Sequence, residues 1–193
     1  FSAPVLAVWL WYTRGKSNDL LIPAGIIVVA ALMLLRQAEH LWRRAGQAAV
    51  GASSERWVVR VIKRHSDLFF NNCVIGSGGD ADHILLFPRC AVIETKTGKG
   101  EVRASGTSLY VGKKKLLKDP VGQVNHQAHI FERRFKVRPL SIVCVVDATN
   151  SAPVVLTTGE VLCSANQLPE VLRRYAPALD RRTAMDIAAK IKK

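Results

Sequence analysis

Residues 82–96 read DHILLFPRCAVIETK, and this stretch decides the fold. It holds two short apolar runs separated by a Pro-Arg break, a pattern typical of two buried strands. Asp82 precedes the first run, and Glu94 and Lys96 end the second. The sequence therefore predicts consecutive strands that carry two carboxylates and one lysine.

The chain around this stretch alternates strand and helix patterns. A β-branched apolar run such as residues 140–146 is typical of a buried strand, and Pro120 favours the first turn of a helix. The expected strands are 68–75, 83–87, 90–93, 102–104, 109–111, 140–146, 154–156 and 160–163, and the expected helices are 55–64, 120–135, 168–175 and 180–191. This order predicts an α/β domain with a mixed central sheet flanked by helices.

The three polar residues at the strands have a defined relation. Glu94 and Lys96 are two residues apart, so on a strand their side chains point to the same side, and Asp82 enters the same sheet. Carboxylates suit a hard cation such as Mg²⁺, which polarises a phosphate and lowers the pKa of a bound water. A lysine can steady developing negative charge. These groups can together support metal-assisted phosphodiester hydrolysis. A polar strand end of no catalytic role has the same composition.

The order of these motifs, from about residue 51 to residue 175, resembles the nuclease-related domain (NERD) family. The matching elements are the Gly51–Glu55 helix lead, Asp82 with His83, the Glu94-Thr95-Lys96 strand end, the hairpin over 98–111, the Pro120-to-Gln123 helix start and the strand at 140–146. Two departures are present. Ser54 stands where the family often has a glycine, and Asp80 could take the place of Asp82.

The resemblance implies a restriction-endonuclease-like fold of the PD-(D/E)xK superfamily. It also implies site roles: Asp82 and Glu94 as ligands of Mg²⁺ or Mn²⁺, Lys96 beside the attacking water, and Gln123 and Glu55 in support of the site or the phosphate. Each supporting role has an alternative. Glu55 also fits an early-helix acid favoured by the helix dipole, and Gln123 fits an exposed first-turn residue. His83 fits a core histidine as well as it fits a metal ligand.

The chain is strongly basic, with 28 Lys and Arg against 15 Asp and Glu and a net charge of +13. A run of lysines near residue 115 fits contacts to nucleic-acid phosphates that read no sequence. The lysines are Lys113, Lys114, Lys115 and Lys118. An anionic membrane face is the competing partner for such a run, and a solvated surface is the third interpretation.

The N-terminal part reads as a transmembrane helical hairpin over residues 1–37. Residues 20–35 and 1–12 are uncharged, and a polar turn separates them. The chain opens with Phe1, so the first span could be truncated. A signal peptide and a buried core helix are the alternatives.

Basic residues after the second apolar stretch predict the orientation. Arg36, Arg43 and Arg44 favour a cytoplasmic main domain at the inner membrane. The expected division is an amphipathic linker helix over 38–50, a NERD-like domain over 51–176 and a C-terminal helix over 177–193.

The sequence thus predicts a membrane-anchored, metal-dependent endonuclease of DNA. Its expected partners are nucleic acid, the membrane and subunits of a membrane complex. The alternative is a catalytically inactive nucleic-acid-binding or scaffold module of such a complex.

Overall fold

The computed structural model describes residues 21–75, 80–105, 108–116 and 119–191, and the chain divides into two compact units, residues 1–49 and 50–193. The described elements are α2 (Leu21–Lys63), β1 (Leu68–Val74), β2 (Asp80–Phe87), β3 (Ala91–Lys96), β4 (Val102–Ser105), β5 (Ser108–Val111), β6 (Lys114–Lys115), α3 (Pro120–Phe135), β7 (Leu140–Val145), β8 (Val154–Val155), β9 (Val161–Ser164), α4 (Leu168–Tyr175) and α5 (Arg181–Ile191). All but the first part of α2 belong to the second unit.

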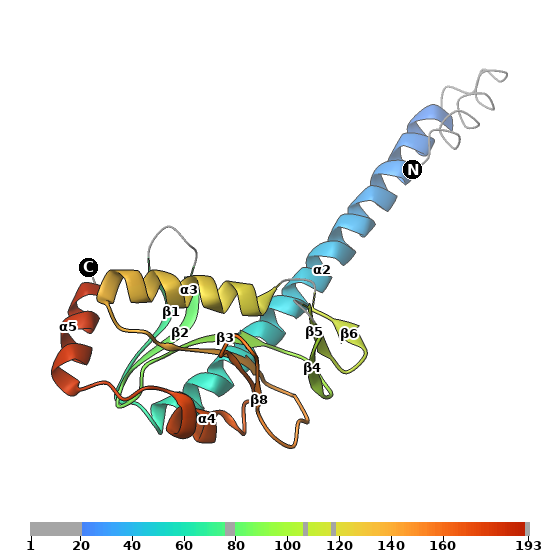
Figure 1. The fold of residues 1–193 in the computed structure, drawn as a ribbon. Helices are drawn as coiled ribbons and strands as arrows, with labels where there is room; N and C mark the ends of the chain where they lie inside the picture. The colour runs from blue at the N-terminus through green and yellow to red at the C-terminus, as the bar shows by residue number, and fades with distance from the viewer. Residues whose placement is uncertain (1–20, 76–79, 106–107, 117–118, 192–193) are drawn as a thin grey trace. The chain divides into compact units, whose positions relative to one another are not determined.

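A six-stranded sheet in the order β1-β2-β3-β7-β9-β8 forms the centre of the second unit (Figure 1). Strands β1 to β3 pair antiparallel, β3, β7 and β9 pair parallel, and β8 returns antiparallel on β9. Helix α3 makes the crossover between the parallel strands β3 and β7. The prediction of a mixed central sheet flanked by helices is therefore confirmed.

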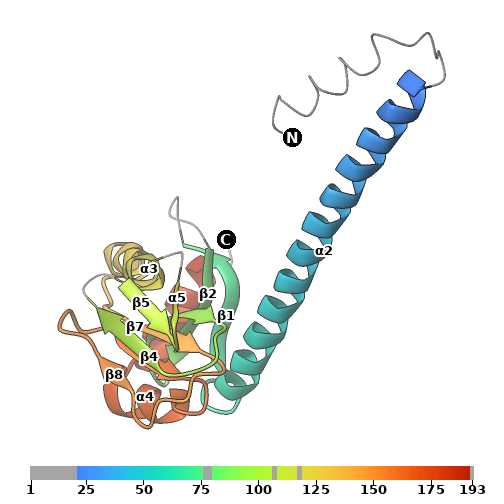
Figure 2. The same ribbon diagram turned by 90° about the vertical axis from the view of Figure 1, so that its right-hand side faces the viewer.

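Each face of this sheet has its own apolar core. Val124 and Phe131 of α3, with Ile187 of α5, pack on one face. Val58 of α2 and Val171 of α4 pack on the other. Figure 2 shows the sheet between α3 on one side and α4 on the other. Apolar burial on both faces explains why β3 and β7 read as nearly continuous apolar runs.

Local signals set both ends of α3, whose predicted range is confirmed. Asp119 caps the N-terminus, because its side chain accepts from the Gly122 N–H at 2.9 Å, and Pro120 follows. At the other end, Lys136 has a φ of 58° and donates its N–H to Glu132 at 2.8 Å. This left-handed residue closes the helix.

A second, three-stranded sheet contains the predicted hairpin, with the order β4-β5-β6. Strands β4 and β5 confirm the hairpin, and β6 adds a short third strand. Gly98 allows the close approach of β3's end to this sheet, since a Cβ there would lie 2.7 Å from the Val111 side chain. The smaller sheet is therefore held close to the chain segment that follows β3.

Two expected helices, 38–50 and 55–64, are one helix in the structure, and the expected break between them was wrong. Gly46 and Gly51 lie inside α2, with open space where a Cβ would stand. A glycine costs a helix only about 1 kcal/mol, so two of them do not end it. Strand β2 also begins earlier than expected, at Asp80, because its pairing with β1 extends to Val74↔Asp80.

The predicted transmembrane hairpin is not supported by the structure. Its first span, residues 1–12, lies outside the described residues. Within the described part of the chain, no helix has both the length and the apolar character needed to cross a membrane.

Phe131→Ala tests the α3 core directly. Phe131 is fully buried, so we expect its truncation to lower the free energy of unfolding by about 3–5 kcal/mol. Urea denaturation followed by circular dichroism measures the change. Arg133→Ala, an exposed position on the same helix, is the matched control and should change stability by less than about 0.5 kcal/mol. Equal losses in both variants would contradict this packing.

Candidate active site

The pairing of β2 with β3 ends at the polar side chains. The last paired residues are His83 and Ile93, although β3 continues along β7 as far as Lys96. Beyond this point the Asp82 carboxylate accepts a hydrogen bond from the Thr95 N–H at 2.7 Å. A carboxylate thus occupies the place that a strand carbonyl would have in a continued ladder.

Glu94 and Lys96 lie next to this gap on β3. The Glu94 side chain is 1% exposed and forms an ion pair with the Lys96 ammonium, which is 24% exposed. A buried carboxylate is tolerated only with a charged or hydrogen-bonding partner. Lys96 meets this need and still reaches solvent, so it can contact a ligand at the surface.

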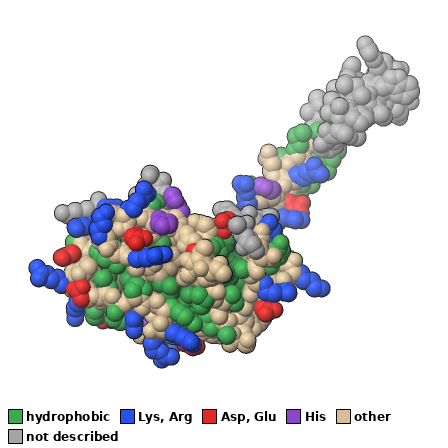
Figure 3. All heavy atoms as spheres, viewed as in Figure 1, with side chains coloured by type: hydrophobic (Ala, Val, Ile, Leu, Met, Phe, Trp, Pro, Cys, Tyr) green, Lys and Arg blue, Asp and Glu red, His purple; other side chains and the backbone are tan. Residues whose placement is uncertain are grey.

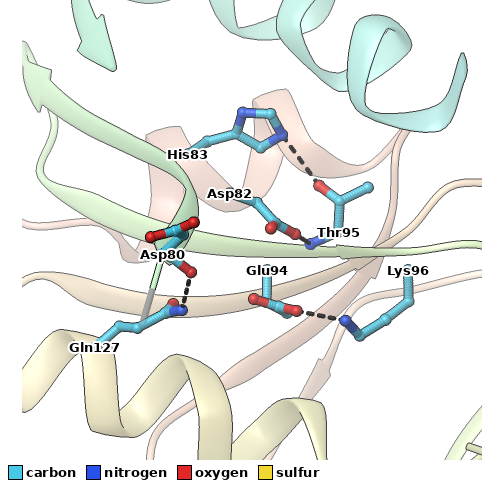
Figure 4. A network of polar contacts seen from close by, with 7 residues as sticks. All are labelled: Asp80, Asp82, His83, Glu94, Thr95, Lys96 and Gln127. Carbon is cyan, nitrogen blue, oxygen red and sulfur yellow. Dashed lines mark hydrogen bonds and ion pairs between the residues drawn. The ribbon is translucent and has the colours of Figure 1, made fainter. Parts of the chain in front are cut away.

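Alternation along the strands sorts the polar side chains between the two faces of the sheet. Asp82 and Glu94 share the face of Ile84 and Val92, which pack in the core with α3. His83 and Thr95 belong to the opposite face. Figure 4 shows the His83 ring on one side of β2, with Glu94, Lys96 and Gln127 on the other.

Burial governs the protonation of Asp82. It raises the pKa of the Asp82 carboxyl above its ordinary value, while the Thr95 N–H and the Lys96 ammonium lower it in part. Lys96 therefore acts on both carboxylates, through the ion pair with Glu94 and through its field at Asp82. A raised carboxyl pKa beside a lysine is common in functional sites.

His83 is held as a core histidine by two hydrogen bonds. Its Nδ1 lies 2.8 Å from Asn71 Oδ1, and its Nε2 lies 3.1 Å from Thr95 Oγ1. Burial lowers the pKa of the imidazole to about 4, so the ring is neutral at pH 7. A neutral ring donates from one nitrogen and accepts at the other, and the two partners satisfy both. Of the two open interpretations, the geometry favours the core histidine over the metal ligand.

Gln127 is a site residue that sequence reasoning did not select. It is 2% exposed, and its Nε2 donates to the Asp80 carbonyl at 2.6 Å. Its Oε1 has no hydrogen-bond partner among the described residues. Gln123, which was selected, is half-buried one turn earlier on the same helix. The four-residue spacing of these glutamines was the available signal, because it places both on one helix face.

The remaining candidates are Glu55, on another element, and Asp80, whose carbonyl accepts from Gln127. Glu55 of α2 lines a cavity with His83 and has no hydrogen bond or ion pair to Asp82, Glu94 or Lys96 among the interactions that the structure describes. The alternative ligand Asp80 is exposed at the start of β2.

The basic run lies at the edge of the smaller sheet. Lys113, Lys114 and Lys115 are exposed, and Lys118 lies outside the described residues. Figure 3 shows Lys and Arg side chains at the edge of the domain where β6 lies.

The donor set of the site fits a hard cation in part. Asp82 and Glu94 offer carboxylate oxygens, and Mg²⁺ in proteins often takes one or two carboxylates and completes its shell with water and phosphate. The described residues contain no group of three or more His, Cys, Asp or Glu that could hold a metal ion. A fully protein-bound centre is therefore not what these residues form.

A mixed α/β domain with carboxylates and a lysine beside two separating strands has the architecture of nuclease-like folds. The family model of the nuclease-related domain (NERD) matches residues 50–148. The chain therefore belongs to the NERD family. No curated protein and no solved structure matches it significantly. The match covers α3 and strands β1 to β7, and so it includes every residue of the site described above.

The Asp82→Asn variant tests whether the buried charge of Asp82 lowers the stability of the folded chain. A carboxyl with a raised folded-state pKa binds its proton more tightly in the folded chain, so its ionised form lowers stability above that pKa. Asparagine keeps the oxygen that accepts from Thr95 and removes the charge. We expect a higher Tm than wild type at neutral pH, and a difference that shrinks as the pH falls through the raised pKa.

Thermal unfolding at neutral pH and at about pH 4, near the ordinary carboxyl pKa, measures this dependence. Asp186→Asn on α5 is the matched control, since Asp186 is exposed. The control should show no comparable gain in Tm. A variant at Asp82 that is less stable than wild type at neutral pH would contradict the role of burial.

Proposed function

We propose that this domain is a metal-dependent nuclease of the PD-(D/E)xK type, which hydrolyses phosphodiester bonds in DNA. The observation that carries the proposal is the grouping of Asp82, Glu94 and Lys96 beside the point where β2 and β3 separate. The family supports a nuclease-related function, and these are the ionisable groups that such chemistry uses.

Each of the three residues has a role that its surroundings support. Asp82 and Glu94 would hold Mg²⁺ or Mn²⁺, and the ion would polarise the scissile phosphate and lower the pKa of the attacking water. Lys96 is anchored by Glu94 and reaches solvent, so its ammonium can orient that water or steady charge on the phosphate. It supplies positive charge without being a ligand.

Gln127 supports the proposed site from inside the core, and the β6 lysines offer the proposed substrate contacts. Gln127 holds the start of β2 through the Asp80 carbonyl, and its buried Oε1 has no hydrogen-bond partner among the described residues. Lys113, Lys114 and Lys115 are exposed near the end of β3 and can neutralise phosphates of the bound strand. These lysines would add affinity without base recognition.

We also propose that α2 holds the protein at the cytoplasmic face of a membrane. Large apolar side chains on the first part of α2 are exposed, among them Ile27, Leu35 and Trp42. Arg36 and Arg43 lie among them and can contact anionic headgroups. Partners within a membrane complex would meet the same surface.

Cleavage of supercoiled plasmid and of single-stranded DNA tests the nuclease. The full chain, kept in mild detergent because of the exposed apolar side chains of α2, is assayed with Mg²⁺ or Mn²⁺ and with EDTA. We expect metal-dependent cutting that falls about 100-fold or more in Glu94→Gln and in Lys96→Gln. Glu101→Gln and Lys99→Gln are matched controls, because both residues are exposed on the same segment.

Two outcomes decide against this function. Cutting that survives EDTA, or that both site variants retain in full, would remove the metal site from the mechanism. A folded chain that binds DNA in a salt-dependent way but never cuts would instead support the inactive nucleic-acid-binding module.

A further inference from the structure

A second surface, lined in part by charged and amide side chains, lies on the opposite face of the sheet from Glu94. It is a cavity of about 680 Å³ between the C-terminal part of α2 and strand β1. All of its lining residues belong to the unit that begins at residue 50. Those used below are Arg56, Arg60, Lys63, Asn71, Asn72 and His83; we call this surface the α2 groove.

One wall of the α2 groove is a row of cations. Arg56, Arg60 and Lys63 are four and three residues apart, so they follow one face of the helix over roughly 10 Å. All three are exposed, and none forms an ion pair among the described residues. Glu55 is the one acidic side chain that lines the groove in the described structure. The wall therefore carries a surplus of positive charge.

The other wall leads to the candidate active site. Asn72 has a φ of 48° and lies between the Asn71↔His83 and Cys73↔Ala81 pairs, so it stands opposite Asp82 in the ladder. His83, which also lines the groove, contacts Thr95, and the Thr95 N–H holds Asp82. One end of the groove is thus one strand position away from a proposed metal ligand.

We propose that the α2 groove binds the sugar–phosphate backbone of a nucleic-acid strand, with Arg56, Arg60 and Lys63 neutralising successive phosphates. A nucleic-acid strand carries one negative charge per nucleotide, so the three cations along this row can each meet a phosphate. The exposed amides of Asn71 and Asn72 offer donors and acceptors to the same strand. The inference that this strand is the substrate rests on the proposed nuclease function. The inference that the groove binds nucleic acid does not rest on it.

The shape of the surface favours a linear polyanion over a lipid surface. A membrane presents its headgroups as a plane, which meets an exposed face and not a row of cations along one wall of a cavity. A strand can enter such a groove lengthwise, alongside the row of cations. The groove would therefore extend the substrate contact to the side of the sheet opposite to Glu94.

The salt dependence of binding tests the proposal. Fluorescence anisotropy with a labelled single-stranded DNA 20-mer is measured in EDTA, so that cleavage plays no part. Arg56→Gln, Arg60→Gln and Lys63→Gln are combined in one full-length chain. Because each contacted phosphate contributes about 0.7 to the slope of log K against log salt, we expect the slope to lose roughly 2.

Two matched variants control for net charge and for folding. A control triple removes the same charge from exposed positions on α3, α4 and α5, and it should leave most of the slope. It combines Arg133→Gln, Arg173→Gln and Arg182→Gln. Arg56→Lys, Arg60→Lys and Lys63→Arg keep the charge in the groove and should keep the slope. Equal losses in the groove and control triples would overturn the proposal, as would an unchanged slope in the groove triple.

Vesicles containing anionic phospholipid provide the competing arm. Loss of vesicle binding with unchanged DNA binding in the groove triple would assign the surface to lipid and overturn the proposal. The nuclease is judged separately. If the wild-type chain cuts DNA but the groove triple has an unchanged salt slope, the groove proposal is wrong and the nuclease proposal stands. If the wild-type chain never cuts DNA but the groove triple has a reduced slope, the groove proposal stands and the nuclease proposal is wrong.

Discussion

The hydrogen bond from the Thr95 N–H to the Asp82 carboxylate is the contact on which the candidate site depends. Strand β3 stays paired with β7 as far as Lys96, whereas β2 pairs with β3 only as far as His83. The Thr95 N–H consequently needs an acceptor in place of a strand carbonyl, because an unsatisfied buried N–H is costly. Asp82 is that acceptor. The gap between the strands and the carboxylate beside it therefore arise together.

Thr95 also joins the two faces of the sheet. Its backbone N–H serves Asp82, and its hydroxyl lies 3.1 Å from the His83 ring on the opposite face. His83 in turn is held by Asn71 of β1. Displacement at His83 would reach Asp82 through two hydrogen bonds, and displacement at Asn71 would reach it through three. The position of the carboxylate thus depends on β1 as well as on its own strand.

Sequence reasoning succeeded where the governing signal is local. Two-residue alternation gave the shared face of Glu94 and Lys96, and the proline at position 120 gave the start of α3. It failed where packing over long sequence distances decides. Gln123 and Gln127 share a helix face, and only the approach of α3 to Asp80 selects the second. The continuity of α2 through Gly51 was missed because a glycine weakens a helix without ending it.

The placement of polar groups argues that this part of the sheet was not shaped for stability alone. Both faces of the sheet are otherwise filled by apolar side chains. At one point the α3 face buries the Glu94 carboxylate, raises the pKa of Asp82 and leaves Gln127 Oε1 without a hydrogen-bond partner in the described chain. Well-packed apolar residues could replace a buried ion pair at little or no cost in stability. Several such expensive groups lie at one strand separation in a nuclease-related domain, and this is the arrangement that the proposed nuclease chemistry would require.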